Sequence, residues 1–156
     1  TTGFGQAVLN LDEATYIDLM RPLGDLAQLP YYQAADRLAE IESALEDLPF
    51  YKPLTRMLSP AVTRVLLIQA RHEAMVEVMR LGLQLEQYHA THGAYPASLD
   101  ALGNVSPDPL TGEPYHYLPT GNSFTLYSVG ENLADDGGTH HLRNGDIVWR
   151  GREIEE

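Results

Sequence analysis

The stretch from Ala61 to His92 constrains the fold most, because it has the pattern of one long helix with very little polar surface. Ser59-Pro60 is a typical start signal, since serine caps a helix and proline suits its first turn, and Gly93 is a typical stop. The polar residues form one narrow stripe at steps of three and four: Gln69, Glu73, Glu77, Arg80, Gln84 and Gln87. Because most of the remaining circumference is apolar, we expect other elements to cover this helix on two sides.

Two shorter helices are predicted before it, and we expect them to cover one of these sides. Apolar residues at helical spacing indicate the first from about Leu11 to Leu29, where Pro22 must kink or split it. Asn10 and Glu13 have the spacing of a capping box at its start, so the residues before them are predicted to be a lead-in. The second helix is predicted from about Tyr32 to Leu48, with an acidic outer face.

After Gly93 the chain becomes rich in turns and short alternating segments. Alternation predicts three short strands, at Tyr115–Leu118, Ser123–Val129 and Asp146–Arg150. The first two strands are predicted to be joined by a hairpin turn at Pro119-Thr-Gly-Asn122. We expect the β unit to cover the second side of the long helix. The prediction is an α+β chain in three parts: a helical extension at 1–60, the long helix with a small antiparallel sheet at 61–150, and a tail at 151–156.

Charge excludes several classes of partner. The 156 residues carry a net charge of −12, with a single lysine and no basic run. A nucleic-acid-binding face must neutralise phosphates with clustered Lys and Arg, and an anionic membrane surface would repel this chain. No apolar run approaches the length of a membrane span, so no span is expected within the chain. Cysteine is absent, which excludes disulfides and thiolate metal sites.

Several motifs of the second half follow one another in a set order. They are Tyr88, His92-Gly-Ala-Tyr-Pro-Ala-Ser-Leu99, Leu102, Asp108-Pro-Leu-Thr-Gly-Glu-Pro-Tyr115, Phe124-Thr-Leu-Tyr-Ser-Val-Gly130, Asp135-Asp-Gly-Gly138 and Asp146-Ile-Val-Trp149. This order resembles the globular domain of the type II secretion major pseudopilins, within the broader type IV pilin-like group. The resemblance covers residues 61–150 and implies a long helix packed on an antiparallel sheet.

The loop before the last strand binds calcium in that family. Carried over by position, the resemblance implies a calcium site at Asp135, Asp136 and Asp146, with Asn132 as a helper. The residue types agree in kind, because calcium takes about six to eight oxygen ligands in flexible geometry. The alternative is an acidic turn that holds no ion, since Asp and Gly are common turn residues.

The long helix departs from the family pattern at its beginning. Pilin-like subunits start with an almost wholly apolar helix that anchors them in the membrane and forms the filament core. Here the apolar surface is interrupted by Arg64, Arg71 and His72. We therefore expect this helix neither to anchor the chain in a membrane nor to form a filament core. The two arginines are seven residues apart on one face, and we expect them to pair with acids of the first two helices.

The resemblance implies a non-enzymatic structural or interaction module of the bacterial envelope with a protein partner, located in the periplasm or otherwise outside the cytoplasm. The chain begins Thr-Thr-Gly rather than Met, so we expect any membrane anchor to lie upstream of it. As an alternative, the helices of residues 1–60 bind the protein partner, which an exposed apolar groove among them would favour.

A metal-dependent enzyme is the less favoured alternative. His89 and His92 lie at the predicted helix end, and His140 and His141 lie in the acidic loop. A zinc site needs about three or four converging ligands, and no spacing in the sequence brings these two pairs together. No nucleophile elbow, phosphate loop or nucleotide-binding fingerprint is present either.

Overall fold

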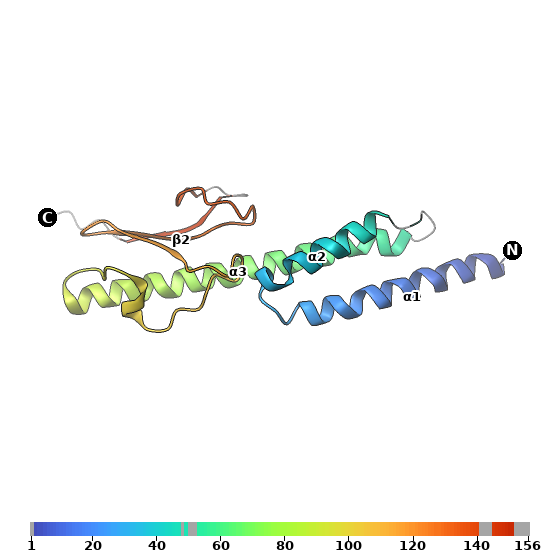
Figure 1. Ribbon diagram of the computed structural model, residues 1–156, viewed down its shortest axis with the longest axis horizontal. Coiled ribbons are helices and arrows are strands. Elements are labelled where there is room, and N and C mark those ends of the chain that lie inside the picture. Colours follow the sequence, from blue (N-terminus) through green and yellow to red (C-terminus); the bar gives the residue numbers. More distant parts are fainter. Residues whose placement is uncertain (1, 48, 50–52, 141–144, 152–156) are drawn as a thin grey trace. The chain divides into compact units, whose positions relative to one another are not determined.

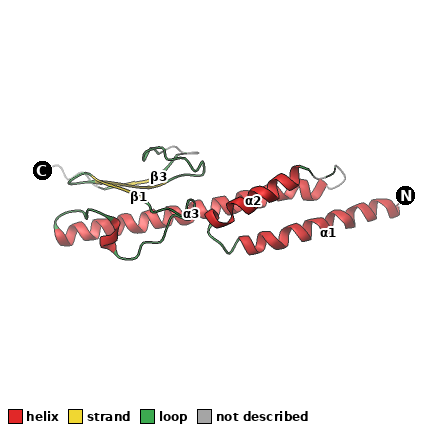
Figure 2. Cartoon of the chain, in the orientation of Figure 1, coloured by secondary structure: helices red, strands yellow, loops and turns green. Residues whose placement is uncertain are grey.

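The structure is a computed structural model that describes residues 2–47, 49, 53–140 and 145–151. The chain is α+β, as predicted, with helices first and a small sheet last (Figures 1 and 2). It divides into two compact units, Thr1–Ile68 and Gln69–Glu156, and the division lies inside the longest helix. Each unit is described by itself.

The first unit contains helix α1 (Thr2–Leu26), helix α2 (Tyr31–Glu46) and the beginning of helix α3 (Pro53–His92). Its core is built mainly by the apolar face of α2. The buried members of this core are Leu23, Ala34, Leu38, Ile41 and Leu45, and Met20, Leu26, Tyr31 and Leu66 pack against them. The apolar positions of α2 recur at steps of three and four, which places them on one face of the helix.

Helix α1 is longer than predicted and is a single element. It begins at Thr2, and Pro22 lies inside it without splitting it. The predicted capping box at its start is therefore wrong. Asn10 lies within the helix, where its side-chain oxygen accepts a hydrogen bond from Gln6 Nε2 at 3.1 Å. Such pairs four residues apart stabilise a helix surface, so Asn10 supports the helix rather than starting it.

Helix α3 begins at Pro53, so the predicted start at Ser59-Pro60 is also wrong. Pro53 occupies the first helical position, where the missing N–H is no loss. The buried backbone N–H of Thr55 then donates to the carboxylate of Asp12 on α1 at 3.2 Å. A carboxylate at a helix N-terminus satisfies a free donor and complements the helix dipole. This cap comes from another helix, which explains why local sequence did not indicate it.

The described residues of the second unit form the rest of α3, a short 3-10 helix η1 (Leu99–Leu102) and three strands, β1 (His116–Pro119), β2 (Phe124–Ser128) and β3 (Ile147–Arg150). The strands form one antiparallel sheet in the order β1-β2-β3. In the register, Leu126 of β2 lies between Tyr117 and Trp149. All three strands lie within about one residue of their predicted positions.

The end of α3 also matches its prediction. The helix stops at His92, and Gly93 follows with a φ of 76° while its N–H donates to the carbonyl of His89 at 2.8 Å. Only glycine adopts this left-handed conformation without strain. The chain then turns, and the Tyr95 hydroxyl donates to Glu86 on the last turns of the helix at 3.1 Å.

The sheet packs on one side of α3 through an unusually close contact. A Cβ added at Gly82 would lie 2.8 Å from ring carbons of Trp149 on β3, so the absence of a side chain lets the indole approach the helix. Other apolar side chains of this segment remain exposed: Met75, Val76, Met79 and Leu83. Within the described residues of the second unit, the sheet covers one side of this part of α3 and leaves these side chains exposed.

A buried carboxylate organises the loop before β1. Asp108 is 2% exposed, and its Oδ1 accepts the backbone N–H of Leu110 at 2.9 Å. Its backbone N–H donates to the carbonyl of Glu113 at 2.9 Å, which closes the turn. Burial raises the pKa of Asp108, although hydrogen bonds to Ser128 and Leu110 oppose that shift. The folded protein therefore disfavours the charged form of this side chain.

We expect Asp108→Asn to make the second unit more stable at pH 7. Because the pKa of Asp108 is raised on folding, the cost of its buried charge is present at neutral pH and disappears as pH falls through the folded pKa toward 3.8. Asparagine keeps the oxygen that accepts the Leu110 N–H and carries no charge. Thermal unfolding between pH 7 and pH 4 should show a stabilised variant whose advantage shrinks on acidification.

The exposed substitution Glu113→Gln serves as the matched control, since it also removes one negative charge from this loop. It should leave the pH profile of unfolding close to that of the unaltered chain. A variant at Asp108 that is less stable at pH 7 and keeps the original pH profile would contradict the prediction.

Candidate metal centre

The candidate site is the loop that joins β2 to β3 in the second unit. Ser128 and Ile147 are paired in the sheet, so the two ends of the loop start side by side. They stay close beyond the strands, because a Cβ added at Gly130 would lie 2.2 Å from the carbonyl oxygen of Gly145. Side chains larger than hydrogen do not fit between them. The loop therefore has a narrow neck made of backbone.

Asp146 lies in this neck and is 1% exposed. Its Oδ1 accepts the backbone N–H of Asp136 at 3.3 Å, and its Oδ2 accepts that of Gly138 at 2.7 Å. Gly137 and Gly138 have φ of 66° and 74°, the left-handed conformation that turns the chain back on itself. The Asp135-Asp-Gly-Gly138 turn is thus wrapped around a buried carboxylate, which its backbone amides satisfy.

The other three predicted ligands lie in the same loop and are exposed. Asn132 Nδ2 donates to Asp136 Oδ2 at 3.2 Å, and Asn132 Oδ1 accepts the N–H of Ala134 at 3.3 Å. Asp135 Oδ1 accepts the N–H of Gly137 at 2.8 Å. The structure therefore brings all four predicted residues into one loop, where each makes a hydrogen bond within the loop.

Electrostatics favours a charged carboxylate at Asp135. The N–H of Gly137 is the main cause that lowers the pKa of Asp135, and the Tyr127 hydroxyl and His116 add to it. His116 Nδ1 lies 3.8 Å from Asp135 Oδ2, and its ring stacks on Tyr127 with 4.6 Å between ring centroids. Asp135 is thus an anion held against the face of the sheet, available to a cation from solvent.

The donor chemistry fits calcium in kind, because carboxylate, amide and carbonyl oxygens are the ligands of this ion. In the part of the chain that the structure describes, no three His, Cys, Asp or Glu side chains gather in an arrangement that could hold a metal ion. Binding would accordingly require the carboxylates of the loop to move closer together. The predicted calcium site stays a prediction.

The histidines considered for a zinc site lie on different elements, with His89 and His92 on α3 and His140 in the loop between β2 and β3. His92 stacks on Tyr88 with 4.0 Å between ring centroids, and His89 stacks on Tyr95 at 4.4 Å. Both lie in the last turn of α3, where positive charge is favourable. His140 Nδ1 lies 3.3 Å from the backbone oxygen of Asp146, and His141 falls outside the described residues. These contacts give His89 and His92 aromatic packing partners at the helix end.

Arg71 pairs with a different acid from the one that the sequence predicted. Arg71 Nε lies 3.6 Å from Glu131 Oε1, in the loop of the candidate site. Both side chains are partly buried, at 28% and 18% exposure. The expectation that Arg71 pairs with an acid of the first two helices is therefore wrong. This ion pair ties the beginning of the loop to α3, and the sequence carried no signal that Glu131 would be the partner.

The backbone of the loop is strained at one position. Leu133 has a backbone φ of 54°, which residues other than glycine rarely adopt. Its N–H donates to the carbonyl of Gly130 at 3.1 Å. Its side chain is 45% exposed, so packing does not explain the conformation. The tight turn at the loop neck does.

Comparison of the chain with models of known protein families, with curated proteins and with solved structures gave no match. Among the helical residues that the structure describes, none lies in a helix that is long and apolar enough to cross a membrane.

Proposed function

We propose that this chain is a non-enzymatic structural and interaction module of the bacterial envelope, related to the type II secretion pseudopilins, whose loop between β2 and β3 is stabilised by calcium. The location follows from the resemblance and is periplasmic or otherwise outside the cytoplasm. The proposal rests on one observation above all. The acidic loop closes around the buried carboxylate of Asp146, at the place where the resemblance puts the calcium loop.

The order of the elements is consistent with this proposal. A long helix ends at a glycine, a Tyr95-Pro96 segment reverses the chain, and three antiparallel strands follow with the acidic loop before the last one. Folds of this kind host different functions, so the loop chemistry carries more weight than the architecture.

Calcium would act on charge and on order. Asp135 and Asp136 are adjacent exposed carboxylates, and the buried Asp146 carboxylate accepts the backbone N–H of Asp136. A divalent cation bound by these oxygens neutralises their mutual repulsion and holds the loop in one conformation. Because the ion binds the folded loop and not the unfolded chain, it should raise the stability of the second unit.

The test is thermal unfolding with calcium, with magnesium and with a chelator, followed by the fluorescence of Trp149. This residue is the only tryptophan of the chain and lies on β3 in the same unit as the loop. At a calcium concentration ~100-fold above the dissociation constant, the expected gain is about 2.7 kcal/mol. Magnesium should give a smaller gain, because it demands a near-ideal octahedron.

Two conservative variants make this test specific. Asp135→Asn and Asp136→Asn keep an acceptor oxygen for the loop hydrogen bonds and lose the charge, so they should lose most of the calcium-dependent gain. Asp100→Asn removes an exposed carboxylate elsewhere in the unit and should keep it. An unfolding midpoint that saturating calcium leaves unchanged would refute calcium binding, and the loop would then be an acidic turn without an ion.

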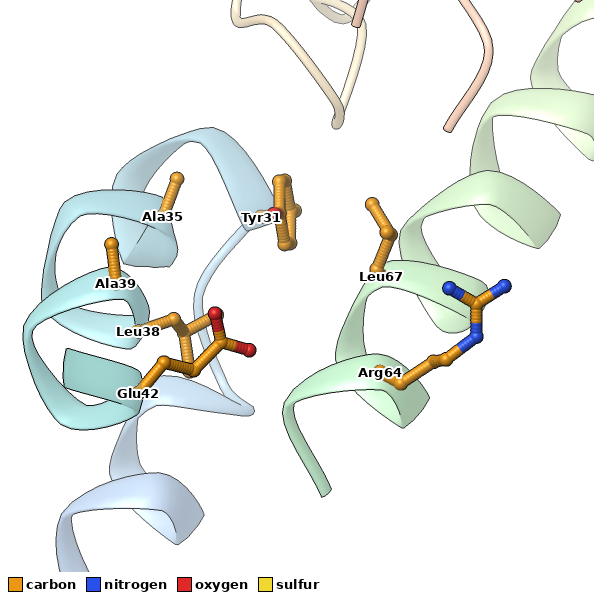
Figure 3. A pocket seen from close by; sticks show the side chains of 7 residues that line it. All are labelled: Tyr31, Ala35, Leu38, Ala39, Glu42, Arg64 and Leu67. Atoms are coloured by element: carbon orange, nitrogen blue, oxygen red, sulfur yellow. The ribbon is translucent and has the colours of Figure 1, made fainter. Parts of the chain in front are cut away.

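A second candidate function is protein binding through the N-terminal helices. It is supported by a pocket between α2 and α3 in the first unit (Figure 3). This candidate concerns a different unit, so the calcium experiment does not decide it.

A further inference from the structure

The pocket in the first unit lies between two helices and is half open to solvent. Its apolar lining comes from Ala35, Leu38 and Ala39 on α2 and from Leu67 on α3, and its volume is about 290 Å³. Figure 3 shows the two short alanine side chains on one wall and Leu67 on the other. Pockets for drug-sized ligands begin at roughly this volume. The space is suited to one large side chain rather than to an extended small molecule.

The polar residues of the pocket are divided between its two walls. Tyr31 and Glu42 stand on α2, and Arg64 stands on α3 (Figure 3). Tyr31 is half-buried, and burial together with the Glu42 carboxylate raises its pKa. Glu42 itself is exposed. The α2 wall therefore presents the negative charge of Glu42, while the α3 wall presents the positive charge of Arg64.

The surface of α2 beside the pocket is acidic. Helix α2 carries four acids and only one base, Arg37, so its net charge is −3; the acids are Asp36, Glu40, Glu42 and Glu46. Arg37 is paired with Glu40 on the outer surface. Glu46 follows Glu42 by one helical turn and is exposed on the same face. The chain as a whole has a net charge of −12. An approaching partner meets negative potential along this helix.

We propose that the α2–α3 pocket binds a basic amphipathic segment of a partner protein, which inserts one large apolar side chain between Ala39 and Leu67 and places its basic residues along Glu42 and Glu46. The inference rests on the second candidate function and is independent of calcium. Apolar anchors that fill a pocket supply most of the affinity at protein interfaces, while flanking charges supply rate and specificity. A second copy of this chain is disfavoured by its own net charge.

The probe is a fluorescein-labelled amphipathic helical peptide made of leucine and lysine, measured by fluorescence anisotropy against the full chain. Two matched peptides test the two parts of the inference. One carries glutamate in place of lysine, and one carries alanine in place of leucine. Only the leucine–lysine peptide should bind well, and its affinity should fall as salt is added.

Pocket filling provides the decisive variant. In Ala39→Trp the new side chain occupies the pocket, and the affinity for the leucine–lysine peptide should fall about tenfold or more. Ala44→Trp adds the same side chain to α2 at an exposed position that does not line the pocket. It should leave the affinity within about twofold of that of the unaltered chain.

A charge pair of variants gives a second readout that does not depend on filling the pocket. Glu42→Gln should weaken the peptide several-fold and reduce the salt dependence, whereas Asp36→Asn, an exposed acid of α2 outside the pocket, should do neither. Circular dichroism confirms that each variant is folded. If Ala39→Trp does not fold, the Glu42 and Asp36 pair decides.

Three results would overturn the inference. The first is no binding of the leucine–lysine peptide. The second is equal binding by Ala39→Trp or by the glutamate peptide, or an effect of Glu42→Gln no larger than that of Asp36→Asn. The third is a dimer in analytical ultracentrifugation that Ala39→Trp abolishes, which would assign the pocket to a second copy of the chain.

Discussion

Replacing Gly130 by alanine is expected to lower the free energy of unfolding of the second unit by about 3 kcal/mol. The added Cβ would lie 2.2 Å from the carbonyl oxygen and 2.9 Å from the carbonyl carbon of Gly145. These atoms belong to the backbone, so no side-chain rotation can relieve the overlap. The two ends of the loop would have to separate.

The expected damage extends to the candidate site. Gly145 directly precedes Asp146, whose carboxylate accepts the backbone N–H groups of Asp136 and Gly138. A shift of the neck would lengthen these hydrogen bonds around a residue that is almost fully buried. An unsatisfied buried carboxylate is costly, so we expect the loop to open and the calcium-dependent gain in stability, where present, to decrease with it.

Gly121→Ala is the matched control for this prediction. Gly121 lies in the β1–β2 turn with a φ of 72°, and an added Cβ would meet no heavy atom within 4 Å. This variant measures the cost of placing alanine in the left-handed conformation without any steric overlap, about 1 kcal/mol. Fluorescence of Trp149 during denaturant unfolding reports both variants. If Gly130→Ala costs no more than Gly121→Ala, the close approach of the two loop ends is refuted.

Sequence patterns located the elements whose signals are local. The three strands alternate over only a few residues each, and turn residues bound them, so their positions followed from side-chain period and turn chemistry. The end of α3 at His92 followed in the same way, because Gly93 supplies the left-handed conformation that ends a helix. Both features depend on neighbours within a few residues.

Elements that depend on distant partners were missed. The start of α3 is fixed by an acceptor on α1, and nothing near Thr55 indicates it. The exposure of Met75 and Leu83 was not predicted either. An apolar side chain in a sequence does not show that another element packs on it, because folded proteins expose many apolar side chains. At the candidate site, the resemblance identified Asp135, Asp136 and Asp146 as a group. It did not indicate that Asp146 is buried and satisfied by backbone amides.

Replacing Asp12 by alanine is expected to lower the free energy of unfolding of the first unit by about 3 kcal/mol. Asp12 Oδ1 accepts hydrogen bonds from the Thr55 N–H at 3.2 Å and from the Thr55 hydroxyl at 2.6 Å. Both residues are fully buried. Alanine would remove this buried acceptor from the Thr55 N–H, whereas the Thr55 hydroxyl keeps the Asp12 backbone oxygen at 3.3 Å.

The contact joins residues that are 43 positions apart, so it also fixes how α1 meets the beginning of α3. Its loss should expose backbone amides of the first turn of α3 to solvent. Hydrogen exchange is therefore expected to accelerate around Thr55 more than in α2, whose core residues such as Ile41 do not depend on this cap.

Three further variants separate charge, hydrogen bonding and packing. Asp12→Asn keeps an acceptor oxygen and loses the charge that complements the helix dipole, so its expected cost is smaller, about 1 kcal/mol. Thr55→Val removes the hydroxyl and leaves the N–H bond in place. Glu13→Ala alters the exposed neighbour on α1 and should change stability by no more than ~0.5 kcal/mol.

A double-mutant cycle of Asp12→Ala with Thr55→Val gives the coupling energy directly. This coupling energy reports the hydroxyl bond at 2.6 Å, because valine keeps the backbone N–H that donates to Asp12. A coupling energy near zero would show that the hydroxyl bond contributes nothing, and the cost of Asp12→Ala would then lie in the loss of the Thr55 N–H bond and of packing.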